Sequence, residues 1–127
     1  SGVISIFARR MIDGDTPLIH GDGEQSRDFT FVDNVVDANL LALAAPNASG
    51  EVYNIGTSRG VTVNELVVSL NQVLGTDLQP EHGPERTGDV RASVADITRA
   101  RRDLGFEPRV SFEEGLRQTV DWMRNSG

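Results

Sequence analysis

The alternation of helix-like and strand-like segments along these 127 residues predicts an α/β or α+β fold. Apolar residues recur every three to four positions in several segments that begin with capping residues or end at glycine, as in amphipathic helices. Short runs rich in β-branched and aromatic residues lie between them, as in strands. The length suits one domain or a piece of a larger one.

The N-terminal segment predicts one helix followed by two short strands. Its apolar residues recur at four-residue spacing: Val3, Phe7 and Met11. The stretch DGDTP over 13–17 then ends the helix, because aspartate, glycine and proline favour turns. Residues 17–20 and 28–32 have strand-like composition and lie on either side of a glycine turn.

The next segment predicts a second helix and a buried strand. Asp33 is expected to cap the helix, which runs through Ala45 to a turn in PNASGE. One face of this helix is apolar and carries Val36, Leu40 and Leu43. The run VYNIG over 52–56 then indicates a buried strand that ends at its glycine.

Two capping boxes predict helices in the second half of the chain. Thr62 and Glu65, three residues apart, form the first box, and Gly75 is expected to end its helix. Ser111 and Glu114 form the second box. The apolar faces behind the two boxes are Leu66, Leu70, Val73 and Leu74, and Phe112, Leu116, Val120 and Met123.

A loop and a short helix separate these two helices. Residues 79–91 lack periodicity and predict a loop with at most short extended pieces. Asp96 is expected to begin a helix that ends near LGF, residues 104–106. No internal repeat or clear domain boundary interrupts the chain.

The composition argues against several function classes. The net charge of −7 disfavours generic binding to nucleic acid or to anionic membranes. No apolar stretch approaches the roughly 18 residues of a membrane span, and no secretory leader is visible. The chain has no cysteine, which excludes disulfides and thiolate metal sites and predicts a reducing cytoplasm.

No pattern of catalytic residues is present. The chain contains no nucleophile-and-base motif and no G-x-G-x-x-G dinucleotide fingerprint. His20 and His82 are too few for a histidine-rich metal site. All twelve basic residues are arginine, so a mechanism that needs lysine must obtain it from outside the chain. We therefore expect no catalytic, cofactor-binding or metal-ligating residue here.

Three arginines near glycines point to an anionic ligand. Arg27 follows the glycine turn in GDGEQSRDF, and Arg86 and Arg91 lie in PERTGDVR. The planar guanidinium binds phosphate oxygens in pairs, and glycine allows the backbone to approach a ligand, so these arginines suit a diphosphate. Asp89 could accept hydrogen bonds from sugar hydroxyls.

A purely structural interpretation stays open on spacing alone. Arg27 and Asp28 would then pin a turn, and Arg86 would pair with Glu85 or Asp89. Surface ion pairs of this kind are common and contribute little to stability.

Four motifs in order resemble the C-terminal half of an extended short-chain dehydrogenase/reductase that acts on nucleotide sugars. They are GDGEQSRDFTFVDNVVDAN, EVYNIGT with TVNEL, PERTGDVRASVAD and LGFEPRVSFEEGLRQTV. The resemblance runs through essentially all of residues 1–127 and is closest to the UDP-glucose 4-epimerase group. It implies the substrate-binding portion of that fold, with helices and short strands and without most of the Rossmann sheet.

The resemblance implies a role for each candidate substrate-binding residue. Arg27 matches the arginine of the family's R-D-[FYW] motif, and Arg86 that of R-x-G-D, and the two would hold the diphosphate from opposite sides. Asp89 matches the aspartate of the second motif, which binds the ribose hydroxyls. Leu18 and His20 match strand positions that line the base, largely through backbone groups, although His20 replaces the usual aromatic residue.

Two more residues are expected at the same pocket. Gln25, in the loop before Arg27, is expected to touch the ligand, and Val3 to line the pocket. Arg91 is expected to support the loop instead.

The same resemblance implies that the catalytic half is missing from this chain. That half binds NAD on a Rossmann sheet through a glycine-rich turn and supplies a tyrosine and a lysine. Here Tyr53 is the only tyrosine, and no lysine exists. We therefore expect NAD in the parent enzyme and none on this chain alone, which would be a truncated part or a stand-alone remnant and inactive by itself.

The leading interpretation is the UDP-hexose-binding part of an NAD-dependent 4-epimerase. The alternatives are a fragment of a nucleotide-sugar 4,6-dehydratase, and a non-catalytic UDP-sugar-binding remnant or one half of a split enzyme. A third interpretation is a structural protein that binds no ligand.

The family fold also implies a partner for the middle of the chain. Residues 33–56 are expected to pack with the missing Rossmann domain in the parent enzyme. Without it, Val52, Ile55 and the apolar helix face would be exposed. Such patches favour association, so we expect a homodimer or a domain-swapped assembly.

Overall fold

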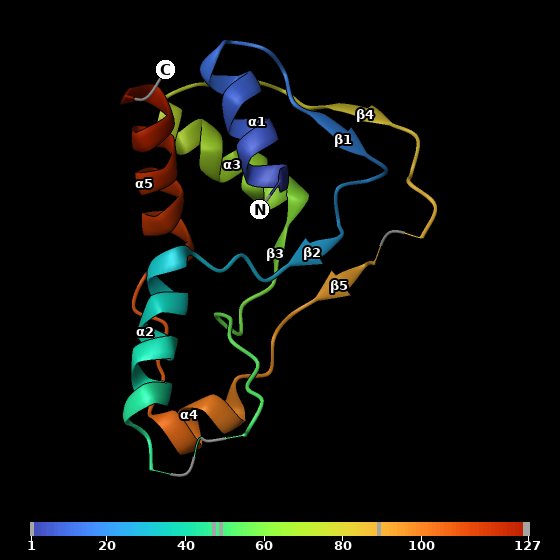
Figure 1. Cartoon of the computed structure of the whole chain (residues 1–127). Helices are drawn as coiled ribbons and strands as arrows, with labels where there is room; N and C mark the ends of the chain where they lie inside the picture. Colours follow the sequence, from blue (N-terminus) through green and yellow to red (C-terminus); the bar gives the residue numbers. More distant parts are fainter. Residues whose placement is uncertain (1, 47, 49, 89, 126–127) are drawn as a thin grey trace.

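The computed structural model describes residues 2–46, 48, 50–88 and 90–125. These residues form a mixture of helices and short strands, which confirms the predicted fold class (Figure 1). The helices are α1 (Gly2–Ile12), α2 (Val32–Ala44), α3 (Val63–Leu74), α4 (Thr98–Leu104) and α5 (Phe112–Asn125). The strands are β1 (Leu18–His20), β2 (Ser26–Arg27), β3 (Val61–Thr62), β4 (Glu81–Gly83) and β5 (Ala92–Ser93).

The strands form two small sheets that bring distant parts of the chain together. β1 pairs in parallel with β4, so that His20 lies opposite Gly83. β2 lies between β3, which is antiparallel to it, and β5, which is parallel. In this second sheet Arg27 lies opposite Val61 on one side and Ser93 on the other.

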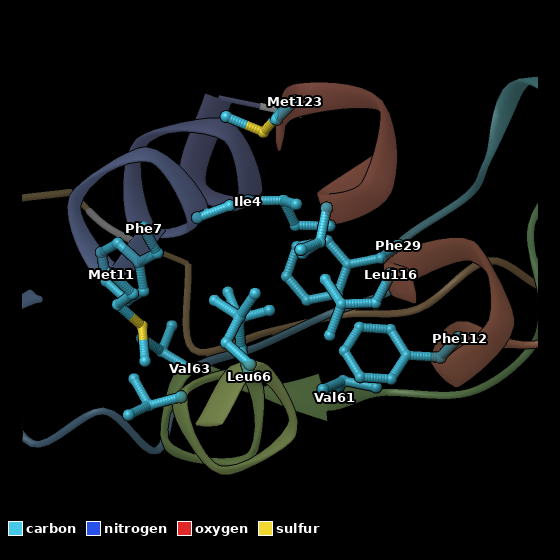
Figure 2. Close-up of a cluster of buried hydrophobic side chains, with 14 of the residues drawn as sticks. Ile4, Phe7, Met11, Phe29, Val61, Val63, Leu66, Phe112, Leu116 and Met123 are labelled. Carbon is cyan, nitrogen blue, oxygen red and sulfur yellow. The ribbon is translucent and has the colours of Figure 1, made fainter. Parts of the chain in front are cut away.

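The larger hydrophobic core, called the main core here, lies among α1, α3 and α5 (Figures 1 and 2). Its aromatic pair, Phe29 and Phe112, has ring centroids 5.8 Å apart. Its buried members are Ile4, Phe7, Ala8, Met11, Ile19, Phe29, Val61, Val63, Leu66, Val67, Leu70, Phe112, Leu116, Val120 and Met123. The apolar periodicity of the first, third and fifth helices therefore predicts most of this core.

A smaller second core lies between α2 and α4, below the main core in Figure 1. Its buried residues are Ala38, Ile97, Ala100, Leu104 and Phe106. Asn34 of α2 is also fully buried, where its side-chain amide donates to the carbonyl of Val110 at 3.0 Å. The Asn34 amide oxygen accepts from the backbone nitrogens of Arg109 and Val110, each at 3.0 Å, which ties α2 to the segment before α5.

The predicted helix boundaries of α3 and α5 are confirmed at their caps. The Thr62 hydroxyl accepts a hydrogen bond from the backbone nitrogen of Glu65 at 3.0 Å. The Ser111 hydroxyl accepts one from the Glu114 nitrogen at 3.1 Å. Gly75 ends α3 with a φ of 70°, a left-handed conformation that glycine adopts without steric cost.

The strand predicted over 28–32 is wrong, because β2 lies just before it at Ser26–Arg27. Asp28 explains the difference, since its carboxylate accepts hydrogen bonds from the backbone nitrogens of Thr57, Ser58 and Ala95. These bonds hold the chain out of a regular ladder. The predicted capping role of Asp33 is wrong as well, because α2 already begins at Val32 and Asp33 lies in its first turn.

The buried strand predicted over 52–56 is also wrong. This segment has no regular structure, and no strand of the described residues pairs with it. Val52 is 79% exposed, whereas Tyr53 and Ile55 are partly buried against the second core. A strand needs a neighbouring ladder to satisfy its backbone, and this part of the chain has none. The loop over 79–91 is confirmed, with β4 as its short extended piece.

One face of α2 is apolar and exposed. Its members, called the α2 apolar face here, are Val32, Val35, Val36, Leu40 and Leu43. Leu40 is 60% and Leu43 85% exposed, which agrees with the exposure expected for these two residues. Ile55 was expected to be exposed too, but it is partly buried by the second core. No helix among the described residues is long and apolar enough to cross a membrane.

Candidate functional site

The glycine turn between β1 and β2 is held by ionic and backbone contacts. Gly21 and Gly23 have φ values of 87° and 78°, which favour glycine. A side chain at Gly23 would also collide with Asn64, whose amide oxygen lies 2.2 Å from where a Cβ would stand. Arg91 donates two hydrogen bonds to the Asp22 carboxylate, at 3.0 and 3.2 Å, and thereby lowers the pKa of Asp22. Arg91 therefore supports the loop, as expected.

Arg27 lies on β2, at the centre of the three-stranded sheet. Its Nη1 donates to the carbonyl of Ser26 at 2.8 Å and to that of Val90 at 2.6 Å. The second bond joins β2 to the loop that carries Arg86. Arg27 therefore anchors this loop and also lines the adjacent pocket.

Arg86 lies in the exposed loop after β4, and its side chain reaches back to β1. Its Nη2 lies 3.1 Å from Nε2 of His20. Gln25, which is buried, donates its side-chain amide to the carbonyl of His20 at 3.2 Å. Three of the predicted binding residues thus contact one another at the end of β1.

A pocket of about 550 Å³ lies between α1, β1 and these loops. Six of the seven predicted substrate-binding residues line it: Val3, Leu18, His20, Gln25, Arg27 and Arg86. The seventh, Asp89, lies outside the described residues. The volume is within the range of pockets that hold small molecules.

Several residues that the sequence motifs do not indicate as ligand-binding also line the same pocket. They are Gly2, Ile6, Phe7, Arg10 and Val63. Helical spacing could have found Arg10, because it stands two turns after Val3 on the same helix. The Arg10 Nε donates to the carbonyl of Thr16 at 2.9 Å. This bond holds the Arg10 side chain near the segment that leads into β1.

The pocket is positive in a chain of net charge −7. Arg10, Arg27 and Arg86 all line it, and guanidinium groups are always charged near neutral pH. Apolar side chains such as Ile6, Phe7 and Leu18 form the rest of its wall. This combination of cations and apolar surface suits an anionic ligand with a flat or apolar part.

The structural interpretation of the arginines is only partly met. Asp28 does pin the chain, through Thr57, Ser58 and Ala95. In the part of the chain that the structure describes, however, Arg86 contacts His20 and makes no ion pair with Glu85. This arrangement leaves Arg86 beside the pocket.

A second, wider hollow continues from the pocket on the side of Arg27. Its volume is about 990 Å³, and it shares Gly2, Val3 and Arg27 with the first pocket. It extends over Val32 of α2 and Trp122 of α5, which are 72% and 68% exposed. The two hollows form a continuous surface with apolar residues at its wider end.

Tyr53 lies apart from this pocket, against the second core. Its hydroxyl donates to the Asp103 carboxylate at 3.2 Å, and its ring lies under the Arg99 guanidinium. Burial raises the pKa of Tyr53, and the Asp103 contact raises it further. The described residues also hold no group of three side chains able to bind a metal ion.

Comparison with known proteins shows which family this chain is similar to. A family model described as "GDP-mannose 4,6 dehydratase" matches residues 2–119. The UDP-glucose 4-epimerase of Mycolicibacterium smegmatis is 41% identical over 125 residues, which are 98% of this chain and 40% of that protein.

Two solved structures are also similar. The UDP-glucose 4-epimerase of Thermotoga maritima, determined with UDP-glucose, superposes with a TM-score of 0.92 at 49% identity, over 99% of this chain and 40% of its own. The Thermus thermophilus UDP-glucose 4-epimerase in complex with NAD superposes with a TM-score of 0.85 at 31% identity, over 99% and 41%.

The chain spans about 40% of the length of these relatives. Its helices and short strands match the C-terminal portion of an epimerase, as the sequence motifs imply. The chain therefore belongs to the GDP-mannose 4,6-dehydratase family of nucleotide-sugar epimerases and dehydratases, which are extended short-chain dehydrogenases/reductases.

Proposed function

We propose that this chain is the nucleotide-sugar-binding part of an NAD-dependent UDP-hexose 4-epimerase. The observation that carries the proposal is that Arg27, Arg86 and four more of the predicted binding residues line the same pocket. Relatives whose names specify UDP-glucose 4-epimerase support the choice of substrate class.

In this proposal the two arginines bind the diphosphate. Arg27 lies on β2 and Arg86 on the loop after β4, and both line the same pocket. Leu18 and His20, at the end of β1, would face the base, and Asp89 would receive the ribose hydroxyls. Val3 and Gln25 would complete the wall.

The chemistry of the proposed reaction belongs outside this chain. NAD in the whole enzyme would take a hydride from the hexose and return it to the opposite face. The residues present do not fit NAD, because the chain has no lysine and Tyr53 donates to Asp103 away from the pocket. This chain's own contribution is to bind and orient the nucleotide sugar.

We further propose that residues 33–56 and the α2 apolar face pack against the remainder of the enzyme. The exposure of Leu40 and Leu43 supports this proposal, as does the wide hollow that reaches Trp122. Without that partner, the same surface would drive this chain to form a homodimer or a domain-swapped assembly. The absence of cysteine supports a location in the cytoplasm.

Two observations favour alternative activities. The matching family model and relatives named dTDP-glucose 4,6-dehydratase favour a dehydratase, which would use the same diphosphate clamp. The absence of lysine favours a protein that binds UDP-sugars without turning them over.

Calorimetry of the chain with UDP and UDP-glucose tests the proposal, with NAD as the negative control. We expect micromolar binding of UDP and UDP-glucose, and none of NAD. Arg27→Ala and Arg86→Ala should each weaken binding about tenfold or more, the effect of a charge-assisted hydrogen bond. Arg27→Lys should weaken it too, because a lysine cannot reproduce the planar fork.

Arg101→Ala is the matched control for the loss of one positive charge. Arg101 lies on α4 and pairs with Glu107 at 2.9 Å. Figure 1 shows α4 at the opposite end of the molecule from α1 and β1, which form the pocket. The Arg101→Ala variant should bind UDP-glucose as well as the unaltered chain does. If the Arg27 and Arg86 variants bound UDP-glucose as tightly as the unaltered chain does, the diphosphate clamp would be refuted.

A further inference from the structure

His20 reaches Arg86 because of strand pairing, although the two are far apart in the sequence. β1 and β4 run in parallel with His20 opposite Gly83, and Arg86 follows Gly83 by one short turn of loop. The end of β1 is itself fixed on both sides. The Gly21 nitrogen donates to the Gly83 carbonyl at 2.9 Å, and the Gln25 amide donates to the His20 carbonyl at 3.2 Å.

In the contact between the two side chains, Arg86 is the donor and His20 is the acceptor. An arginine is always protonated and can only donate, so the 3.1 Å contact requires Nε2 of His20 to accept. His20 is therefore neutral in this contact, with its proton on Nδ1. His82 differs, because its Nδ1 donates to the backbone carbonyl of Gly21 at 2.7 Å and not to a side chain.

In the part of the chain that the structure describes, the Arg86 side chain hydrogen-bonds to His20 alone. The loop on either side of it, residues 84–88, is exposed. A long arginine side chain loses considerable rotamer freedom when it is fixed by a ligand. The hydrogen bond from Nη2 to the half-buried ring of His20 restricts the guanidinium before a ligand binds. Among the described residues no other hydrogen bond occupies its remaining donors.

We propose that the side chain of His20 is a positioning residue that holds Arg86 ready for the diphosphate of the nucleotide sugar. This inference rests on the proposed function of the pocket. It assigns the imidazole a task distinct from the base-lining role implied for the backbone of β1. Positioning reduces the entropy lost when the ligand binds, so it should appear as tighter binding.

A double-mutant cycle measured with UDP-glucose tests the proposal. His20→Phe should weaken binding about three- to tenfold, as expected for one side chain that must be ordered by the ligand. His20→Gln should restore most of the affinity, because its amide oxygen can accept from Arg86. In the Arg86→Ala background, His20→Phe should have no further effect.

Two results would overturn the proposal: unaltered or tighter binding by His20→Phe, or additive losses in the double variant. His82→Phe is the matched control, since it removes the other imidazole of the same strand pair. Its effect on UDP-glucose binding should be independent of Arg86.

Nitrogen NMR of the two imidazoles separates this inference from the proposed function. The Nε2 of His20 should give the signal of an unprotonated ring nitrogen, and Arg86→Ala should shift it. Protonation at Nε2, or no response to Arg86→Ala, would refute the contact. This measurement needs no ligand, so failure of UDP-glucose to bind would reject the proposed function without affecting its result.

Discussion

The main core and the second core differ in how completely they close upon themselves. Among the described residues, fifteen buried apolar side chains make up the main core and five make up the second core, two of which are alanines. The main core has three helices around it, whereas α2 packs on α4 with one side and leaves its apolar face exposed (Figure 1). Hydrogen bonds of Asn34 to Val110 and of Thr57 to Asp28 also link segments around the second core.

The candidate site lies beside the main core and not beside the second core. The pocket is built on α1, β1 and β2, which belong to the well-packed region. In the proposed function, binding of a nucleotide sugar would therefore depend on the part of the fold that contains the main core. The α2 region, by contrast, presents a surface suited to a further partner.

A matched pair of leucine-to-alanine changes should give the largest contrast. Leu66 is fully buried at the centre of the main core (Figure 2), so Leu66→Ala should lower the free energy of unfolding by about 2–5 kcal/mol. Leu43 is 85% exposed on α2, so Leu43→Ala should lower the free energy of unfolding by less than about 0.5 kcal/mol. Chemical denaturation measures both values, and similar losses would contradict the comparison.

Removal of the buried amide of α2 should have the next largest effect. Asn34→Ala leaves the Val110 carbonyl and two backbone nitrogens without their partner, so we expect a loss of about 1–3 kcal/mol. Hydrogen exchange should show the loss confined to α2, α4 and the segment before α5. Asn54→Ala, at an exposed position, is the control. Uniform loosening of α1 and α3 would show that the two regions are not separable.

The same contrast marks how far the sequence predicts the fold. Local signals, such as the Thr62 and Ser111 caps and the spacing of Leu66 with Leu70, correctly predict α3 and α5. The strand expected over 52–56 fails because strand composition alone does not provide a neighbouring strand.

The sequence predicts six residues that line one pocket, but it does not predict the contacts between them. The family motifs pointed to Arg27 and Arg86, and both line one pocket. The bond between Arg86 and His20 depends on the parallel pairing of β1 with β4, which no local pattern reveals. Arg10 was missed because its position on the pocket wall depends on how α1 packs.

Charges placed on the α2 apolar face should change association with little effect on stability. Leu40→Glu with Leu43→Glu alters side chains that are 60% and 85% exposed, so the free energy of unfolding should stay within about 0.5 kcal/mol per site. Light scattering should show the unaltered chain as a dimer or larger assembly and the double variant as a monomer. Val68→Glu, a change at a 57% exposed position on α3, should leave the assembly intact. A monomeric unaltered chain would show that the α2 apolar face does not associate with itself. The remaining part of the proposed enzyme would then be its sole expected partner.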